Sequence, residues 1–237
     1  MANSYFEFKE FKIYQDRSAF KVTTDACVLG AYAYALNPDS VCDIGTGTGI
    51  IALMLAQKFP GSIIDAVEID KLSAVQAREN VDASPWPERI TVFNQSIQDF
   101  STLNKKKYNL IVCNPPYYED HLRSKDNQKN LTKHNYKISI KELAISINIL
   151  LRDEGVFYTI MPAFAFGKLR EDLERFNIRL FEKLGIHSKL GKPFYRYIGG
   201  FCRKTDSIKE NTLIIYNENG KYSNSFKKLL KDYYLAF

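Results

Sequence analysis

An apolar run that ends in a rigid polar turn occupies residues 108–117 of this 237-residue chain: Tyr108-Asn109-Leu110-Ile111-Val112-Cys113-Asn114-Pro115-Pro116-Tyr117. The run is short, its centre is β-branched and two prolines stop it. This pattern predicts a buried β-strand over 108–113 that is followed by a stiff turn. Because open α/β sheets bind ligands at the carboxyl ends of their strands, the turn is a candidate functional site.

The turn carries groups that suit an exocyclic amine. Its two prolines have a fixed φ and no N–H, so the segment presents carbonyl oxygens in an extended arrangement. The Asn114 side-chain oxygen and the Pro115 carbonyl oxygen can each accept one amine hydrogen, and the Tyr117 ring offers a flat surface for a base. This arrangement aims the nitrogen lone pair at an electrophile without a strong base. A plain strand-ending loop is the alternative at this point.

A glycine-rich turn, Gly45-Thr46-Gly47-Thr48-Gly49, lies between a predicted strand over 41–44 and a predicted helix over 50–58. Such a turn lets backbone approach a ligand closely and points free helix N–H groups at it. A dinucleotide fingerprint needs glycine where Ile50 stands. Asp43, just before the turn, would repel a pyrophosphate and attract an ammonium or sulfonium group. The pattern therefore disfavours nicotinamide cofactors.

Two more acids follow predicted strands. Glu68 ends the strand predicted over 62–68, roughly twenty residues beyond the glycines, at the distance expected of a carboxylate that binds ribose hydroxyls. Asp99 follows the strand predicted over 89–94, and we expect it at the strand tip, where it can accept a hydrogen bond from an adenine amine. For either acid alone, a solvated loop position is the ordinary alternative. Their shared place at strand ends on one sheet edge favours a ligand site.

Polar residues from Lys21 to Asp25 precede a stretch of small residues. This pattern predicts a helix with Thr24 or Asp25 as its N-cap. The functional interpretation is that the loop and the helix start, with Lys21 and Thr24, close over a ligand.

Composition is typical of a globular protein, with 45% hydrophobic residues, 25% charged residues and a net charge of +6. Four cysteines lie far apart without a CxxC pair, and neither His121 nor His134 has a partner at metal-ligand spacing, so no disulfide framework and no metal are expected. No apolar stretch has the length of a membrane span and no signal peptide is recognised, so we expect no membrane association and a cytoplasmic location. The positive charge favours a polyanionic partner.

A polar loop beyond Tyr117 is rich in lysine and arginine and poor in acid. A structureless loop of this length inside a compact domain tends to be functional or disordered. We expect its basic side chains to clamp phosphates, and a solvated flexible loop is the alternative.

Strands alternate with helices along the chain, and strand signals recur near its end. This order predicts an α/β fold: a doubly wound, Rossmann-like sheet of seven strands, mostly parallel, with an antiparallel C-terminal hairpin. No linker composition divides the chain. We expect one domain over 1–237, with a short N-terminal lid at about 1–30 and a basic loop at about 118–140.

The motifs together resemble those of the class I S-adenosylmethionine-dependent amino-methyltransferases, over about residues 20–162. In that family the glycine loop and the first acid hold the methionine moiety, the second acid binds ribose, the third binds adenine, and the Asn-Pro-Pro-Tyr turn holds the target nitrogen. The resemblance implies catalytic roles for Asn114, Pro115, Pro116 and Tyr117. It implies S-adenosylmethionine as cofactor, with contacts from Lys21, Thr24, Asp43, Gly45, Gly47, Gly49, Glu68, Asp99 and Asn114.

A narrower resemblance covers nearly the whole chain. It rests on Phe11-Lys12-Ile13-x-Gln15-Asp16-Arg17, Lys21-Val22-x-Thr24-Asp25, Glu79-Asn80-Val81, Ser84-Pro85-Trp86, Lys133-His134 and Lys231-Asp232-Tyr233-Tyr234-Leu235. These stretches look like those of bacterial enzymes that methylate N6 of adenine 37, beside the anticodon of a valine tRNA, although Thr23 stands where glycine is expected. The resemblance implies an enzyme whose partner is the anticodon loop of that tRNA, with no metal and no obligate protein partner. RNA contacts are expected from Arg123, Lys125, Lys129, Lys133 and His134.

The turn by itself leaves other functions open, because it recognises an amine and not a particular purine. The alternatives are another adenine-N6 or guanine-N2 RNA methyltransferase, a DNA adenine methyltransferase, a protein-glutamine methyltransferase and a non-catalytic RNA-binding module. A DNA enzyme would need an additional base-reading segment. Cofactor binding separates the enzymes from the non-catalytic module.

Overall fold

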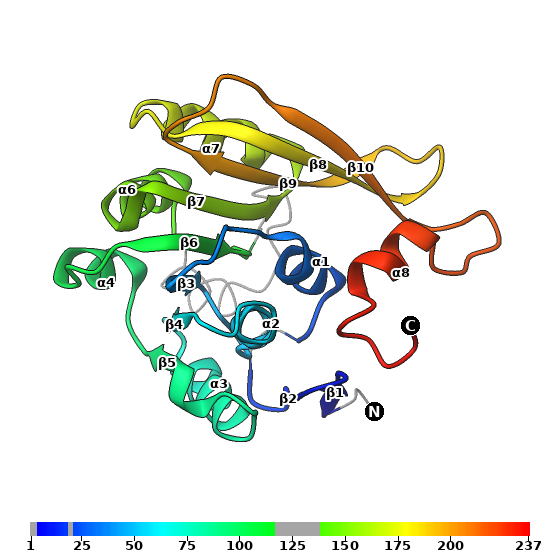
Figure 1. The fold of residues 1–237 in the computed structure, drawn as a ribbon, viewed down its shortest axis with the longest axis horizontal. Helices are drawn as coiled ribbons and strands as arrows, with labels where there is room; N and C mark the ends of the chain where they lie inside the picture. The colour runs from blue at the N-terminus through cyan, green and yellow to red at the C-terminus, as the bar shows by residue number, and fades with distance from the viewer. Residues whose placement is uncertain (1–3, 19–20, 117–137) are drawn as a thin grey trace, which may run out of the picture.

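An eight-stranded sheet in the order β10-β8-β9-β7-β6-β3-β4-β5 forms the centre of the protein (Figure 1). The structure is a computed structural model and describes residues 4–18, 21–116 and 138–237. Within the described part of this eight-stranded sheet, β9 alone runs against its neighbours, and the other pairings are parallel. The strands are β3 (Ser40–Ile44), β4 (Ile63–Val67), β5 (Ile90–Phe93), β6 (Tyr108–Cys113), β7 (Leu151–Met161), β8 (Arg179–Lys189), β9 (Phe194–Cys202) and β10 (Lys209–Tyr216).

Helices cover both faces of the sheet, as a doubly wound fold requires (Figure 1). One face carries α1 (Thr24–Tyr32), α2 (Ile50–Lys58) and α3 (Lys71–Asp82), and the other carries α4 (Ile97–Leu103), α6 (Ile140–Leu150) and α7 (Ala163–Glu174). A short turn of 3-10 helix, η1 (Pro87–Arg89), precedes β5, and α8 (Asn224–Leu230) packs against α1 and β10. None of the described helices is long and apolar enough to cross a membrane. The predicted mostly parallel α/β fold is confirmed.

The sheet has one strand more than the seven predicted. The antiparallel hairpin consists of β8 and β9, with His187 opposite Phe194, and β9 lies between β7 and β8. The last strand, β10, does not pair with β9 but adds in parallel to the free edge of β8, where Leu213 lies opposite Ile186. An uncovered strand edge carries unpaired N–H and C=O groups, and β10 satisfies those of β8.

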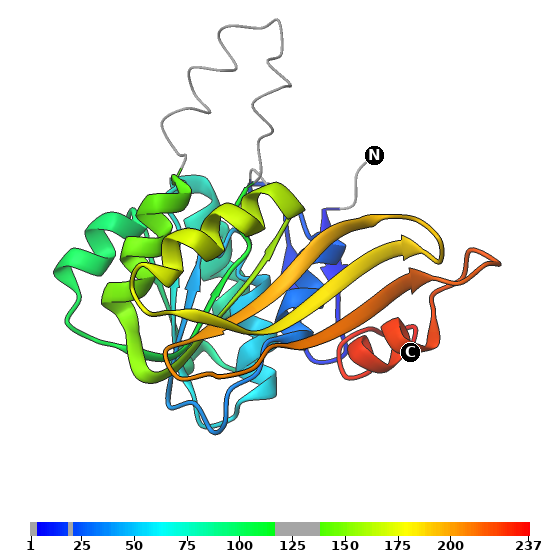
Figure 2. The same cartoon turned by 90° about the horizontal axis from the view of Figure 1, so that it is seen from above.

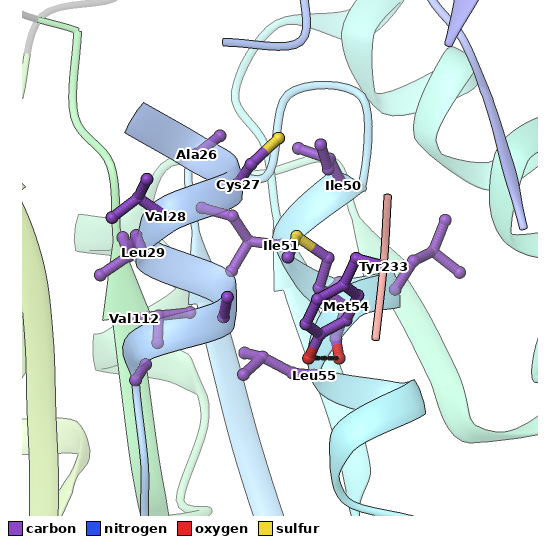
Figure 3. Packing of buried hydrophobic residues seen from close by; sticks show 14 of the residues in the cluster. Ala26, Cys27, Val28, Leu29, Ile50, Ile51, Met54, Leu55, Val112 and Tyr233 are labelled. Carbon is purple, nitrogen blue, oxygen red and sulfur yellow. Dashed lines mark hydrogen bonds between the residues drawn. The ribbon is translucent and has the colours of Figure 1, made fainter. Parts of the chain in front are cut away.

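Helices α1 and α2 pack closely against each other through buried hydrophobic side chains (Figure 3). Gly30 makes the close approach possible, because a Cβ there would lie 2.9 Å from the Met54 sulfur. Leu29 is fully buried in this cluster, and such a side chain contributes about 1.5–3 kcal/mol on burial. Tyr233 covers the far side and donates a hydrogen bond of 3.2 Å to the Met54 carbonyl oxygen.

The two ends of the chain pack against each other. Strands β1 (Tyr5–Glu7) and β2 (Lys12–Tyr14) form a separate antiparallel pair that the sequence did not predict. Phe8 forms a β-bridge with Tyr234, and Lys9 Nζ donates to the Phe237 carbonyl oxygen at 2.7 Å. The N-terminal pair is therefore fixed before the chain continues past β2 towards α3.

Candidate active site

Three strands end at the same level, and each is followed by a residue that the sequence analysis selected. Ile44 of β3 lies opposite both Val67 of β4 and Cys113 of β6. The next residue along the three strands is Gly45, Glu68 and Asn114, respectively. The parallel register thus brings the glycine loop, the second acid and the Asn-Pro-Pro turn to one edge of the sheet.

The glycine loop has a backbone that other residues would not adopt without strain. Gly45, Gly47 and Gly49 have φ values of 70°, 58° and 83°, in the left-handed region that favours glycine. A Cβ at Gly45 or Gly47 would have nothing within 4 Å. The loop therefore presents bare backbone to open space, which leaves room for a ligand to approach it.

Asp43 is fully buried beneath this loop. Its Oδ2 accepts hydrogen bonds from Thr46 Oγ1 at 2.6 Å and from Ala52 N at 3.1 Å. Among the residues that the structure describes, its Oδ1 has no hydrogen-bond partner. Burial raises the pKa of this carboxyl group from 3.8 to about 7, against the opposing effect of its hydrogen bonds. A buried carboxylate oxygen without a partner suits a cationic ligand.

Glu68 follows β4 and links the glycine loop to the start of α3. Its Oε2 accepts from Gly47 N at 2.8 Å and its Oε1 accepts from Asp70 N at 2.8 Å. The side chain is nearly buried, and burial raises its pKa. A carboxylate offers about four acceptor positions, so two backbone donors leave capacity for hydroxyl groups of a ligand. Asp70 caps α3 by accepting from Ser73 N at 2.8 Å.

Asp99 does not lie at a strand tip, and that prediction is wrong in detail. It is an exposed residue in the first turn of α4, six positions beyond Phe93, the last residue of β5. Ser96 caps this helix, and the Asp99 carboxylate accepts from Ser96 Oγ at 2.7 Å. Because α4 begins shortly after the end of β5, the Asp99 carboxylate still lies on the side of the sheet where the parallel strands end.

Asn94 was missed by the sequence analysis. Its Nδ2 donates to the carbonyl oxygens of Glu68 and Ile69 at 2.9 and 3.0 Å. It therefore ties the end of β5 to the segment that carries Glu68. An asparagine as the last residue of a predicted strand is the signal that points to it.

Asn114 is half-buried, Pro115 is buried and Pro116 is exposed at the end of β6. The preceding residue, Cys113, lies opposite Thr159 of β7 on its other side, so β3 and β7 flank the turn. Tyr117 and the basic residues Arg123, Lys125, Lys129, Lys133 and His134 lie outside the described residues.

The N-cap of α1 is Thr23 and not Thr24 or Asp25. Thr23 Oγ1 accepts from Ala26 N at 3.2 Å, and Thr24 is the first helical residue. Asp25 instead forms a salt bridge of 2.9 Å with Arg196 of β9. Lys21 is exposed in the loop before the helix. The ion pair fixes the start of α1 against the sheet beyond β7.

Asn80 is a second residue that the sequence analysis did not assign to the site. It is fully buried on α3. Its Oδ1 accepts from Tyr14 N at 2.9 Å, and its Nδ2 donates to Tyr14 O and Thr48 O, both at 2.8 Å. Gln76, one turn earlier, accepts from Arg17 N at 3.0 Å. These amides hold the chain beyond β2 against the glycine loop, and polar residues at helical spacing are the signal that indicates them.

Within the described part of the chain, no group of three or more histidine, cysteine, aspartate or glutamate residues could hold a metal ion. The charged groups of the edge are carboxylates in a largely buried setting. The site is therefore suited to a ligand that combines positive charge with hydroxyl groups and that extends along the strand ends.

The family model described as "Methyltransferase small domain" matches residues 32–139. Similar proteins include one from Dyadobacter fermentans at 38% identity over 99% of both chains. Another from Bacteroides fragilis is 36% identical over 99% of both chains, and one from Histophilus somni is 38% identical over 98% of both. All three are named tRNA1(Val) (adenine(37)-N6)-methyltransferase.

Solved structures share the fold at low sequence identity. A predicted O-methyltransferase from Agrobacterium tumefaciens has a TM-score of 0.69 at 15% identity, over 88% of this chain and 96% of its own. The structure of M. jannaschii TYW2 in complex with AdoMet has a TM-score of 0.57 at 14% identity, over 86% of this chain and 89% of its own.

Proposed function

This chain belongs to the tRNA1(Val) (adenine(37)-N6)-methyltransferase family, and we propose that it transfers a methyl group from S-adenosylmethionine to N6 of adenine 37, beside the anticodon of a valine tRNA. The full-length similarity to relatives of that name supports the substrate. The register that aligns Gly45, Glu68 and Asn114 supports the chemistry, because it brings a candidate cofactor loop next to a candidate amine-binding turn.

The residues at the carboxyl edge of the sheet fit S-adenosylmethionine. The Asp43 oxygen without a partner suits the positive groups of the methionine moiety. The remaining acceptor positions of Glu68 suit the ribose hydroxyls, and Asp99, exposed on α4, suits the adenine amine. Open space over Gly45 and Gly47 gives the ligand room. We assign Gly49, Lys21, Thr24 and Asn114 to the same site as further cofactor contacts.

When bound, S-adenosylmethionine supplies a methyl group that is activated by the positive charge on sulfur. The Asn114 side-chain oxygen and the Pro115 carbonyl oxygen accept the two hydrogens of the adenine amine. They turn its lone pair out of ring conjugation. They would then stabilise the positive charge that nitrogen gains as its bond to the methyl carbon forms and the carbon–sulfur bond breaks, with the electron pair left on sulfur. Nitrogen would then lose one of its two protons to solvent. Pro116 stiffens the turn. Because the methyl group is already activated, the proposal includes no metal ion.

The target base must leave its stack before it reaches the turn. Unstacking costs less in an exposed loop than in a duplex. We assign Tyr117 as the ring that stacks on the extruded adenine, a contact worth about 1–3 kcal/mol. The basic side chains after Tyr117 are assigned to tRNA phosphates: Arg123, Lys125, Lys129, Lys133 and His134. A tRNA substrate also makes the cytoplasm the expected place of action, and no obligate protein partner is proposed.

The test is to incubate the protein and radiolabelled S-adenosylmethionine with total tRNA, with DNA and with a protein extract in separate reactions. Label should enter tRNA, and mass spectrometry of the digested nucleosides should identify N6-methyladenosine. Label in DNA, in protein or in guanosine would contradict the proposal. The Asn114→Ala variant should lose transfer at unchanged fold.

A matched control is Asn109→Ala, at the opposite end of β6. Asn109 accepts hydrogen bonds from Ser40 N at 3.1 Å and from Arg152 at 3.0 Å, away from the carboxyl edge. This variant should lose stability while turnover per folded molecule stays close to that of the unmodified protein. Equal losses of turnover in both variants would mean that Asn114 has only a structural role.

A further inference from the structure

We propose that the uncovered side of the β8–β9 hairpin is a second RNA-binding surface, which holds unpaired nucleotides of the tRNA beside the target adenine. This inference rests on the proposed function. We call it the hairpin surface, made of Lys183, His187, Lys189, Lys192, Phe194 and Tyr197. In Figure 2, β8 and β9 extend beyond α7, whereas α8 lies on the opposite side of these strands. Beyond α7, no described helix covers this face of the two strands.

Aromatic rings form a row along this face, each in contact with the next. The rings of His187 and Phe194 are stacked with centroids 3.9 Å apart, and Phe194 lies 5.3 Å from Tyr197. Tyr197 in turn packs against Phe166 of α7 at 5.7 Å. Phe194 is nevertheless 40% exposed. An exposed ring that is held by rings behind it is a ready platform for base stacking, which tolerates any base.

A hollow of about 110 Å³ lies beside these rings, and its lining includes Lys183, Gly185, Phe194, Tyr197, Glu210 and Thr212. The Phe194 ring lies directly against Gly185, because a Cβ there would come within 2.3 Å of the ring. Glycine therefore lets the ring lie flat on the neighbouring strand. Lys183 Nζ is 5.0 Å from the Tyr197 ring centroid at the side of the hollow. The hollow combines a flat aromatic wall with polar groups, as planar bases require.

The charge of the surface favours a polyanion. Over the residues that the structure describes, neither Lys189 nor Lys192 takes part in a salt bridge, while both are exposed at the hairpin turn. Lys183 pairs with Glu210 at 3.6 Å, but the Glu210 side chain is 66% exposed. An exposed pair of this kind contributes little, so a phosphate can replace the carboxylate. Three lysines against one acid complement the charge of RNA phosphates.

The register places the hairpin surface at the level of the proposed catalytic turn. Met161, the last residue of β7, lies opposite Tyr197 of β9, and Tyr197 lies opposite Gly185 of β8. On the other side of β7, Thr159 lies opposite Cys113, the residue before Asn114. Tyr197 is therefore two strand spacings, about 10 Å, from the line of β6. Beyond it, β8 continues past the end of β7 and carries Lys189 outward.

A further exposed ring lies on the helix that follows β7, the strand between β6 and β9 in the sheet. Phe164 is 84% exposed in the first turn of α7, which begins directly after β7 and Pro162. Because β7 is parallel to β6 and pairs with β9, the start of α7 lies at the same edge of the sheet as Asn114 and Tyr197. Nucleotides on one side of an extruded base can therefore meet exposed rings and lysines along this edge.

The first test compares two double substitutions with the same charge change. Lys189→Ala with Lys192→Ala removes the unpaired cations of the hairpin surface, and Lys227→Ala with Lys228→Ala removes two exposed cations of α8. Binding of a fluorescent anticodon stem-loop is measured by anisotropy over a range of salt concentrations. The hairpin variant should bind about tenfold more weakly at 0.1 M salt, with a log–log salt slope smaller by about 1.4, while the α8 variant stays near the unmodified protein.

The second test concerns the Phe194 ring as the platform for base stacking. Phe194→Ala should weaken stem-loop binding about tenfold and Phe194→Tyr should restore it, while calorimetry shows unchanged S-adenosylmethionine binding in both, which also reports folding. Binding that none of the hairpin substitutions alters would overturn the hairpin surface. Because binding is measured without turnover, a protein that binds the stem-loop through this surface but transfers no methyl group would contradict the proposed function alone.

Discussion

Replacement of Asp43 by asparagine should stabilise the protein at alkaline pH although it removes a buried charged side chain. Burial raises the pKa of Asp43 from 3.8 to about 7, so the carboxyl group binds its proton more tightly in the folded than in the unfolded protein. The free energy of unfolding therefore falls as the pH rises from about 4 to about 7. The difference between the two pKa values corresponds to about 4 kcal/mol above pH 7.

Asparagine keeps the acceptor that Thr46 Oγ1 and Ala52 N use and places its amide where Oδ1 has no partner among the described residues. A buried amide without a partner costs about 1–3 kcal/mol. We therefore expect Asp43→Asn to gain about 1–3 kcal/mol at pH 8 and to be neutral or slightly destabilised at pH 4. Urea unfolding at the two pH values measures both effects. Affinity for S-adenosylmethionine, measured by calorimetry, should fall in the same variant.

The control is Asp65→Asn on the neighbouring strand. Asp65 lies opposite Cys42, and its Oδ2 accepts from Lys106 Nζ and from Tyr108 Oη, both at 2.7 Å. Because its charge has a partner, the substitution should destabilise the protein at pH 8 by about 1–3 kcal/mol. If Asp43→Asn lost as much stability at pH 8 as at pH 4, the argument that an unpaired buried charge destabilises this site would be refuted.

Three further predictions concern the site. Asn114→Ala should abolish methyl transfer in single-turnover experiments and change the dissociation constant of S-adenosylmethionine less than threefold, and a parallel loss of both would contradict its role at the amine. Asn80→Ala should raise the KM for S-adenosylmethionine about tenfold with a smaller change in kcat, because three backbone groups of the N-terminal segment and glycine loop lose their partner. An unchanged KM would show that the loop keeps its shape without this amide. Cofactor affinity should fall by up to tenfold per pH unit below about pH 7, as Asp43 takes up a proton, and a flat pH profile in titration calorimetry would exclude Asp43 as the partner of a positive ligand group.

The N-terminal segment connects these predictions with the fold. Asn80 holds it at the glycine loop, and the ion pair between Asp25 and Arg196 holds the start of α1 at β9. The described parts of the segment are thus fixed at two places along the carboxyl edge of the sheet. We therefore expect a change at either place to affect Lys21 and Thr24, which lie between the two places in the sequence.

Local sequence patterns determined the elements of the fold. The strand predicted over 108–113 is β6, and the helix predicted over 50–58 is α2, residue for residue. Both depend on a hydrophobic period and on flanking glycine or proline, which act within a few residues. The family could also be recognised from the sequence, because each of its motifs is a short contiguous stretch and the motifs follow one another in the expected order.

Only the tertiary structure decided how these pieces meet. The pairing partner of β10, the contact between the N-terminal and C-terminal segments and the contacts of the Asn80 amide were not predictable, since each depends on residues far apart in the chain. Asn80 and Tyr14 are 66 positions apart, and no local pattern encodes their contact. Asp99 was misplaced for a related reason: its carboxylate is acceptable both after a strand and in the first turn of a helix, and the cap at Ser96 selected the helix. Local sequence therefore specifies what each segment is, while pairing and register, which arise from packing of the whole chain, specify which side chains share an edge.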